Sequence, residues 1–439
     1  MNWILKVKTS KGMRRECRLG RKAASEIMLV LLTISIVSLT TNVKPVKSEW
    51  TGTVYIRADG SIDPPDAPIT TYDNVTYILT GNITGRIGII VEKDGIIVEG
   101  ASYFISVSGF DPKPVAINLT DRNGVTIKNI NIQMTGFGYA IYLRNSTLTK
   151  IFSNTIIINA EGGACPGVYL EGSSNNTISG NKIMGESGVI GVHLDYYYSD
   201  IKGCNIFSYN NTINYNDINC GKYGVYIDTS YSNVVSGNTI RNGDFGIYVY
   251  NHAYNNMILN NNVSYCYDGI NVYNEANNNT ISHNIISKCS NAGIFVGRSE
   301  NCIISYNNLT RNGYGVYTSY SSRNKIYHNN FIDNAVQAYN YNSADWWDNN
   351  YPTGGNYWSD YRGTDEKSGS NQNQPGSDGI GDTPYEISSK GTTAKDNYPL
   401  MVPIPEFSSA IILPLFMFLA LLSLALTKKR LSKRTTKNT

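Results

Sequence analysis

The chain has 439 residues, of which 16% are charged, 40 are glycine and 33 are tyrosine, and its formal net charge at pH 7 is +3. The length suits one large domain or two ordinary ones, and the charged fraction is below the usual quarter. Because the basic residues gather at both ends and leave a near-neutral to acidic middle, the composition gives no support to a nucleic-acid partner.

Residues 1–49 have the features of a targeting segment. Eight basic residues precede the apolar run IMLVLLTISIVSLT at 27–40, which is the arrangement of a signal peptide or of an uncut signal anchor. No A-x-A cleavage motif follows the run, so both alternatives stay open. In either case we expect the rest of the chain to be exported.

A repeat begins near the middle of the chain. A Gly-aliphatic-X-aliphatic unit recurs at intervals of roughly 22–24 residues, with one longer interval after Gly191. The glycines that open the units are Gly167, Gly191, Gly224, Gly246, Gly269, Gly293 and Gly315. Two asparagine landmarks keep the same phase, one at Asn233, Asn256, Asn279, Asn301 and Asn324 and the other at Asn238, Asn261, Asn284 and Asn307. Three landmarks that hold phase over a period of this length indicate a solenoid.

Within each unit the apolar residues alternate, as in GVYI, NTIS and NKIM, which is typical of short strands. We therefore predict an all-β fold, a single-stranded right-handed parallel β-helix with coils of about 22–24 residues and terminal transmembrane segments. Aliphatic residues such as Val225, Ile247 and Ile270 are expected to point inward and stack on their equivalents about 4.8 Å away. The asparagines are expected to form ladders at the turns.

The repeat also sets the domain boundaries that we expect. Residues 50–337 would form the β-helix, and a loop at 195–210, which contains Cys204, lengthens one of its coils. Residues 338–402 are aromatic and rich in glycine, and they would form a cap, because an uncovered solenoid end exposes strand edges. Residues 403–439 would form a transmembrane helix and a basic cytoplasmic tail.

The anchor rests on the uncharged stretch SSAIILPLFMFLALLSLAL at 408–426, which precedes a basic tail. A stretch of this length spans a bilayer, and the basic tail marks the cytoplasmic side. We therefore expect the β-helix at the extracellular face of the cell membrane.

The opening VYIRADGSIDPPDAPI, the NNTISGNKI coils and the segments GGNYWSDYRGT, DGIGDTPY and DNYPLM resemble archaeal surface proteins with a NosD-like β-helix. The resemblance covers about residues 50–402. It implies carbohydrate-binding and sugar-hydrolysis repeats, while the family name comes from an accessory factor for copper assembly of nitrous oxide reductase. The C-terminal segment is similar to archaeal sorting signals, in which Pro405, Glu406 and Phe407 would be recognised and the tail replaced by a lipid anchor.

The residue two positions after each landmark glycine must face outward, because its neighbours on both sides are core aliphatics. This column reads Tyr142, Tyr169, His193, Tyr226, Tyr248, Asn271, Phe295 and Tyr317. An outward stripe of rings favours a platform for sugar stacking, so we predict its aromatic members as glycan-binding residues. The alternative is that tyrosines simply cover a pleated surface and stabilise their cross-strand neighbours.

Three carboxylates stand four residues after successive glycines, namely Glu171, Asp195 and Asp228. They are expected to stack about 5 Å apart beside His193, where a bound cation or raised pKa values would relieve their repulsion. Glycosidases use paired carboxylates at about this separation or wider. We predict these three as candidate catalytic residues of a lyase or hydrolase, with solvated turn carboxylates as the alternative. No basic residue is expected in the cluster, since Arg241 falls on another side of the coil.

Metal sites find less support in the sequence. Asp378 and Asp382 in SDGIGDTPY are spaced like ligands of a calcium loop, although a plain turn explains them equally well. The four histidines fall at different positions of the coil, so copper is not expected from residue content. Cys266 and Cys289 are separated by one repeat and would stack on neighbouring coils, as a disulfide, as two small core residues or, least favoured of the three, as a metal site.

Nine N-x-S/T sequons make candidate glycosylation sites in an exported chain. They are Asn74, Asn82, Asn118, Asn145, Asn175, Asn210, Asn262, Asn278 and Asn308. A repeat rich in Asn and Thr also produces sequons by composition alone, and asparagines buried in ladders would not be modified.

Three classes of function follow. The first is a surface protein that binds polysaccharide or surface glycan or has a structural role in the envelope. The second is a carbohydrate-active enzyme that uses Glu171, Asp195 and Asp228. The third, implied by the family name only, is a copper-assembly accessory protein.

Overall fold

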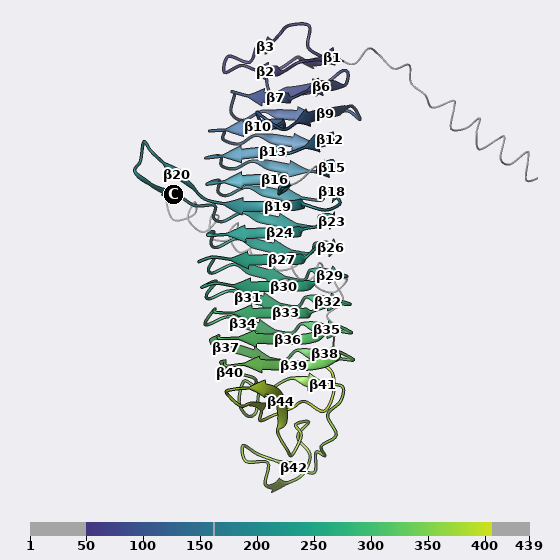
Figure 1. Cartoon of the computed structure of the whole chain (residues 1–439), viewed down its shortest axis with the longest axis vertical. Coiled ribbons are helices and arrows are strands. Elements are labelled where there is room, and N and C mark those ends of the chain that lie inside the picture. The colour runs from purple at the N-terminus through teal and green to yellow at the C-terminus, as the bar shows by residue number, and fades with distance from the viewer. Residues whose placement is uncertain (1–49, 161–162, 406–439) are drawn as a thin grey trace, which may run out of the picture. The chain divides into compact units, whose positions relative to one another are not determined.

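The computed structural model describes residues 50–160 and 163–405, which contain 45 β-strands and no α-helix (Figure 1). No helix that could cross a membrane occurs in this part of the chain. The predicted signal segment, the predicted 408–426 span and the residues Glu406 and Phe407 lie outside the described residues.

Three sheets run along the solenoid, and each coil contributes one strand to each sheet. Sheet A contains β1 (Trp50–Thr51), β6 (Ile83–Gly85), β9 (Phe104–Gly109), β12 (Asn131–Gly136), β15 (Thr155–Ala160), β18 (Lys182–Gly185), β23 (Asp217–Cys220), β26 (Thr239–Arg241), β29 (Asn262–Ser264), β32 (Ile285–Ser287), β35 (Asn308–Thr310), β38 (Asn330–Ile332) and β41 (Tyr357–Trp358).

Sheet B contains β3 (Ile62–Asp63), β2 (Val54–Ile56), β7 (Ile87–Val91), β10 (Val115–Thr120), β13 (Tyr139–Arg144), β16 (Cys165–Glu171), β19 (Val189–Asp195), β24 (Tyr223–Asp228), β27 (Phe245–Tyr250), β30 (Asp268–Tyr273), β33 (Ala292–Gly297), β36 (Tyr314–Ser319), β39 (Val336–Tyr341), β44 (Tyr385–Lys390) and β45 (Ala394–Asp396). Sheet C contains β4 (Ile69–Thr71), β5 (Thr76–Leu79), β8 (Ile97–Glu99), β11 (Thr126–Lys128), β14 (Lys150–Phe152), β17 (Thr177–Ser179), β22 (Thr212–Asn214), β25 (Val234–Ser236), β28 (Met257–Leu259), β31 (Thr280–Ser282), β34 (Ile303–Ser305), β37 (Ser322–Tyr327) and β40 (Ala344–Trp346).

Neighbouring coils pair in parallel, which confirms the predicted β-solenoid. In sheet B, Val225 is paired with Ile247 and Ile247 with Ile270, and all three side chains are fully buried. A single coil has too little apolar surface to form its own core, so each coil covers the aliphatic side chains of the next. The same residue types must therefore recur at the same place in every coil.

Asparagine ladders, which begin at Asn176 and Asn154, fill two corners of the coils that follow, as predicted. In the first ladder, the backbone N–H and the Nδ2 amide of Asn233 both donate to Oδ1 of Asn256, over 2.9 and 3.1 Å. In the second, Asn238 donates to Asn261 over 3.0 Å from each of the same two groups. These side chains are at most 1% exposed, so the ladders satisfy amides that would otherwise be buried without partners.

One predicted ladder position was wrong by a residue. Cys302, and not Asn301, follows Asn279 in the first ladder, because Thr280 is paired with Ile303. The backbone N–H of Cys302 donates to Oδ1 of Asn324 over 2.8 Å, as an asparagine would at that place. Asn301 precedes it in the left-handed conformation with φ of 56° and is exposed. The interval between ladder positions varies slightly from coil to coil, so spacing alone did not distinguish the two.

Residues 195–210 form an antiparallel hairpin of β20 (Tyr197–Ser199) and β21 (Cys204–Ile206), which projects sideways from the coils in Figure 1. Near the other end, β42 (Lys367–Ser368) and β43 (Gln374–Pro375) form a second hairpin. The indole rings of Trp347 and Trp358 are 1% exposed and cover the last aliphatic layer. The second ladder ends there on Asp396, whose carboxylate accepts from the Asn356 N–H over 2.7 Å.

Candidate functional site

The predicted outward column lies on the outer face of sheet B. Strand pairing places its members side by side on consecutive strands, for example Tyr169 with His193 and His193 with Tyr226. The column continues one coil further than predicted, since Tyr317 is paired with Tyr339. We refer to Tyr142, Tyr169, His193, Tyr226, Tyr248, Phe295, Tyr317 and Tyr339 as the aromatic stripe; Asn271 interrupts it between Tyr248 and Phe295. Tyr339 was missed because Gln337 stands where the coils of the predicted column have glycine or alanine.

A second outward column, which the sequence analysis did not find, adds rings beside the stripe. It contains Tyr139, Tyr223, Phe245 and Tyr314, each three residues before a stripe residue. Tyr223 and Phe245 stack with ring centroids 5.4 Å apart and planes 2° apart. The signal for this column was an aromatic residue directly before the glycine or alanine of four units, as in YGVY and FGIY.

The rings are arranged differently at the two ends of the stripe. From Tyr142 to Tyr248 neighbouring rings lie face to face, with interplanar angles of 27°, 23°, 16° and 11°. From Phe295 to Tyr339 the pairs are T-shaped, at 78° and 87°. In a face-to-face stack each ring covers its neighbour's face, whereas in a T-shaped pair one ring touches its neighbour only with an edge. The rings at the C-terminal end of the stripe therefore stack on one another less completely.

His193 lies inside the face-to-face stack, with its side chain 14% exposed. Burial and the positive charge of Lys222 lower the pKa of His193 to about 3, so the imidazole is neutral near pH 7. Its Nε2 atom has no hydrogen-bond partner among the described residues and lies 3.9 Å from Oδ2 of Asp195. His193 therefore acts as one more flat ring of the stack.

The three predicted carboxylates lie along the edge of the stripe, and each accepts a hydrogen bond from a tyrosine of the stripe. Glu171 is paired with Asp195 on the next strand. The hydroxyl of Tyr142 donates to Glu171, that of Tyr169 to Asp195 over 3.0 Å, and that of Tyr226 to Asp228 over 2.7 Å. Burial and the adjacent carboxylates raise the pKa of all three phenols, which remain protonated donors.

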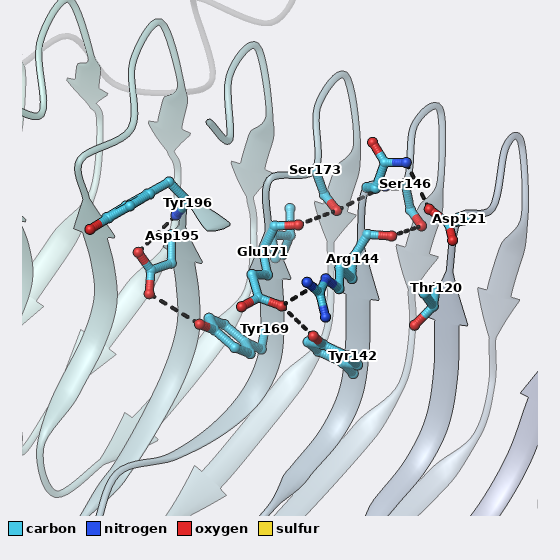
Figure 2. A network of polar contacts seen from close by, with 12 residues as sticks. Thr120, Asp121, Tyr142, Arg144, Ser146, Tyr169, Glu171, Ser173, Asp195 and Tyr196 are labelled. Carbon is cyan, nitrogen blue, oxygen red and sulfur yellow. Dashed lines mark hydrogen bonds and ion pairs between the residues drawn. The ribbon is translucent and has the colours of Figure 1, made fainter. Parts of the chain in front are cut away.

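The expectation that no basic residue joins this cluster was wrong. Arg144 is paired with Glu171, and its Nε lies 3.6 Å from Oε2 of Glu171, so Glu171 lies between Arg144 and Asp195 (Figure 2). The hairpin holds the guanidinium from the other side, because Arg144 lies over the Tyr197 ring at 4.5 Å. Arg241 instead pairs with Asp217 in sheet A.

Asp195 is the carboxylate whose titration is most perturbed in this cluster. Burial, and then the negative charges of Asp228 and Glu171, raise its pKa to about 6, against the hydrogen bonds from the Tyr196 N–H and the Tyr169 hydroxyl. The cluster thus contains Asp195, which titrates near neutral pH, and Arg144, which lies one coil from Glu171, the carboxylate next to Asp195. Such a group can exchange a proton with a bound hydroxyl.

The predicted metal ligands lie in the C-terminal segment. Asp382 accepts hydrogen bonds from the N–H groups of Glu366 and Lys367, and Asp378 accepts from Gly369 and Ile380. Both carboxylates thus hold the backbone of the segment at 366–369. Within residues 50–160 and 163–405, no three His, Cys, Asp or Glu side chains converge as a metal site.

Five of the six cysteines in the described ranges are buried, and only Cys204 in the hairpin is exposed. Cys266 and Cys289 are free thiols that interact across neighbouring coils, and this hydrogen bond lowers the pKa of Cys266 and raises that of Cys289. Cys289 donates its backbone N–H to Asn312, so this pair extends a third corner ladder. Copper would require additional soft ligands, which the described residues do not bring together at this pair.

None of the nine sequon asparagines is buried, since all lie at turns or on outer strand faces, while the ladder asparagines are different residues. Asn118 is paired with Tyr142 and therefore stands at the N-terminal end of the stripe. Asn175 and Asn210 face each other on neighbouring coils, with a 3.4 Å hydrogen bond between their side chains.

A groove of about 810 Å³ lies away from the stripe, over the outer face of sheet A. Its lining includes Ile157, Met184 and Asn219 from three successive strands. The stripe and its carboxylates contribute nothing to this groove.

Two family models match the chain. Residues 196–363 match the model described as periplasmic copper-binding protein (NosD), and residues 94–264 match the right handed beta helix region. No curated protein matches the sequence.

Solved structures with a similar fold are distant in sequence. A double mutant of the periplasmic alginate epimerase AlgG is 14% identical over 67% of this chain and 84% of that chain, with a TM-score of 0.35. The A-module of the mannuronan C-5 epimerase AlgE4 of Azotobacter vinelandii is 14% identical over 63% and 85%, with a TM-score of 0.44. PfbA, a surface adhesin of Streptococcus pneumoniae, is 13% identical over 72% and 91%, with a TM-score of 0.40. The two family matches and the parallel solenoid together support a NosD-like right-handed β-helix protein.

Proposed function

We propose that this protein is displayed outside the cell and binds polysaccharide or surface glycan along the aromatic stripe of sheet B. The observation that carries the proposal is the stripe itself, in which rings recur on consecutive strands with a spacing of about 4.8 Å. Aromatic rings with a polar tip suit a ligand that is apolar on one face and rich in hydroxyls at its edge.

The C-terminal part of the stripe is the proposed platform. Phe295, Tyr317 and Tyr339 form T-shaped pairs at 5.2 Å, so some ring faces are not covered by a neighbour. The N-terminal part presents ring edges, because its faces are stacked on one another and its hydroxyls already bind carboxylates. A sugar ring would therefore stack at the C-terminal part and meet polar edges further along.

A second candidate function is carbohydrate cleavage at the N-terminal part. It is favoured by the row Arg144, Glu171 and Asp195, in which the pKa of Asp195 is raised to about 6. A carboxylate that titrates near neutral pH, beside one paired with an arginine, would provide an acid and a base or nucleophile.

A third candidate, copper assembly, follows only from the description of one family model. The donors within residues 50–160 and 163–405 do not fit that metal, since no three candidate ligands converge and His193 is enclosed between rings. We therefore derive no role for copper.

The test is a glycan and polysaccharide array with the full-length protein, read for retention and for new reducing or unsaturated ends. Retention without new ends is the expected result. Release of products that is abolished by Asp195→Ala would establish the enzyme instead. Silence on both readouts would overturn glycan binding and leave a structural envelope protein.

A further inference from the structure

Two cysteines occupy neighbouring places in the third corner ladder, where the chain passes from sheet A to sheet B. Cys266 lies between β29 and β30, and Cys289 lies between β32 and β33. The two coils are in register at this corner, because Ser264 is paired with Ser287. Just beyond that pair, the N–H of Ser290 donates to the carbonyl of Cys266 over 2.9 Å. Cys266 and Cys289 are therefore direct neighbours along the solenoid, with backbones one coil spacing apart, or about 4.8 Å.

Both sulfur atoms point into the same corner of the core. Each thiol lies close to the backbone carbonyl two residues before it, at 3.5 Å for Cys266 and 3.7 Å for Cys289. Glycines of sheet B leave room for the sulfurs. A Cβ atom added to Gly246 would lie 3.3 Å from Sγ of Cys266, and one added to Gly269 would lie 3.2 Å from Sγ of Cys289. The two side chains thus have the same orientation on adjacent coils, and each is 2% exposed.

A thiol is a weaker ladder member than the asparagines of the coils that follow. The N–H and Nδ2 groups of Asn312 both donate to Oδ1 of Asn334, over 2.9 and 3.0 Å. Cys289 donates its backbone N–H to Asn312, but its sulfur is only a weak acceptor for the coil before it. Two adjacent cysteines therefore lack amide hydrogen bonds between their coils, and a covalent bond would join the coils in their place.

The same two coils also lack a stacked pair of rings. In the aromatic stripe, β30 contributes Asn271 and β33 contributes Phe295. In the second outward column, the same strands contribute Asp268 and Ala292. The rings of Tyr273 and Phe295 do span this step, but their centroids are 6.3 Å apart and their planes are tilted by 52°. Ring stacking therefore joins these coils less closely than the preceding ones, at the step where the two cysteines lie.

We propose that Cys266 and Cys289 form a disulfide that links two neighbouring coils of the solenoid. Disulfides join Cα atoms about 4.4–6.8 Å apart, and the spacing of neighbouring coils falls within this range. Both thiols are free in the structure, so the bond requires the two side chains to rotate toward each other. An oxidising environment maintains such a bond. Its presence in the cell therefore rests on the proposed display outside the cell, whereas the site itself does not.

The disulfide forms through two exchanges with a small disulfide oxidant. The thiolate of Cys266 attacks one sulfur of the oxidant, which gives a mixed disulfide and releases the other half of the oxidant as a thiolate. The thiolate of Cys289 then attacks the Cys266 sulfur and releases the second half. The two cysteines lose two electrons and two protons, and the oxidant becomes two thiols. Because both sulfurs are buried, the oxidant reaches them when the coils open locally or before they close.

Cys302 provides a matched control, because it is a ladder cysteine without a cysteine on the adjacent coils. It is fully buried in the first ladder, between Asn279 and Asn324. A role as a small core residue would apply to Cys302 as well as to the pair. Disulfide formation within the ladder applies to the pair alone.

The experiment unfolds the full-length protein in an alkylating reagent without reductant and maps its tryptic peptides by mass. One sample is isolated directly from cells, and a second is first equilibrated with reduced and oxidised glutathione in dilute denaturant, which opens the coils locally. Trypsin cleaves after Lys288, so Cys266 and Cys289 fall on separate peptides. Thermal unfolding with and without reductant is then compared for the wild type, Cys266→Ser and Cys302→Ser.

The expected result in both samples is a linked pair of peptides, lighter by two hydrogen atoms than the sum of the free peptides. Cys302 should be alkylated. Reductant should lower the unfolding midpoint of the wild type and of Cys302→Ser by about 5 °C or more, and it should leave the midpoint of Cys266→Ser unchanged.

Alkylation of both Cys266 and Cys289 in the two samples would overturn the disulfide. A linked pair that appears only after equilibration with glutathione would establish the site and count against display outside the cell, so the two proposals fail separately. An equal response of Cys266→Ser and the wild type to reductant would overturn the stabilising link between the coils.

Discussion

The imidazole of His193 stacks on the phenol ring of Tyr226, with centroids 4.4 Å apart and planes 16° apart. A charged imidazolium in this position would have to lose its hydration between two rings, so the stack selects the neutral form. His193 thus performs the same packing role as the tyrosines on the neighbouring coils, although its chemistry differs from theirs.

We predict that this histidine makes folding sensitive to acid. Its folded-state pKa is about 3, below the ordinary value, so between about pH 6.5 and pH 3 the unfolded chain binds a proton that the folded chain does not. Its contribution to the free energy of unfolding should therefore fall as the pH is lowered, by at most about 1.4 kcal/mol per pH unit. Denaturant unfolding of the wild type and His193→Phe at several pH values measures this, since phenylalanine keeps the ring and cannot titrate. Parallel pH profiles for the two proteins would contradict the assignment.

The asparagine ladders should contribute strongly to stability. Asn256 accepts from Asn233 through Oδ1 and donates to Asn279 and to the carbonyl of Ser230 through Nδ2. Asn256→Ala removes these bonds and leaves buried donors of Asn233 unpaired, so the free energy of unfolding should fall by about 2–4 kcal/mol. Equilibrium denaturant unfolding measures the loss.

The matched control is the neighbouring Asn255, which is exposed and has φ of +57°. Asn255→Gly suits that left-handed conformation and should change the free energy of unfolding by less than about 1 kcal/mol. An equal loss in the two variants would mean that the ladder adds nothing beyond the turn geometry.

The C-terminal segment should respond to pH in the opposite direction from His193. Asp396 is fully buried, and burial raises its pKa to about 7 against the N–H donors of Asn356, Trp358 and Tyr398. From about pH 4 to pH 7 the folded chain keeps a proton that the unfolded chain loses, so its contribution to stability should fall as the pH rises. In Asp396→Asn this slope should disappear, while overall stability drops because the amide cannot accept from all three donors. A slope that persists in the variant would assign it to other groups.

The fold was predictable because two periodicities agree. The alternation of apolar residues predicted the strands. The recurrence of the same residue types from one coil to the next predicted which side chains stack, as for Val225, Ile247 and Ile270. The prediction of Asn301 as a ladder residue, where the structure has Cys302, arose because the interval between ladder positions is not strictly constant. A cysteine in a ladder of asparagines could not be recognised from spacing alone.

The site was predictable only in part, because its members come from different places in the repeat. The outward column followed from strand alternation, whereas the contact of Arg144 with Glu171 depends on side-chain reach across coils. The strand β44, which is paired with β39, comes from an irregular segment without a period. No local pattern links residues that only the capping strand β44 brings together.

The most direct measurement is calorimetric titration of the full-length protein with an oligosaccharide retained on the array, comparing Tyr317→Ala with Tyr215→Ala. Tyr317 lies in the T-shaped part of the stripe, while Tyr215 is 63% exposed at another corner and serves as the matched control. The account predicts a loss of at least about tenfold in affinity for Tyr317→Ala and little change for Tyr215→Ala. Unchanged affinity in Tyr317→Ala, or an equal loss in both variants, would contradict glycan binding by the stripe.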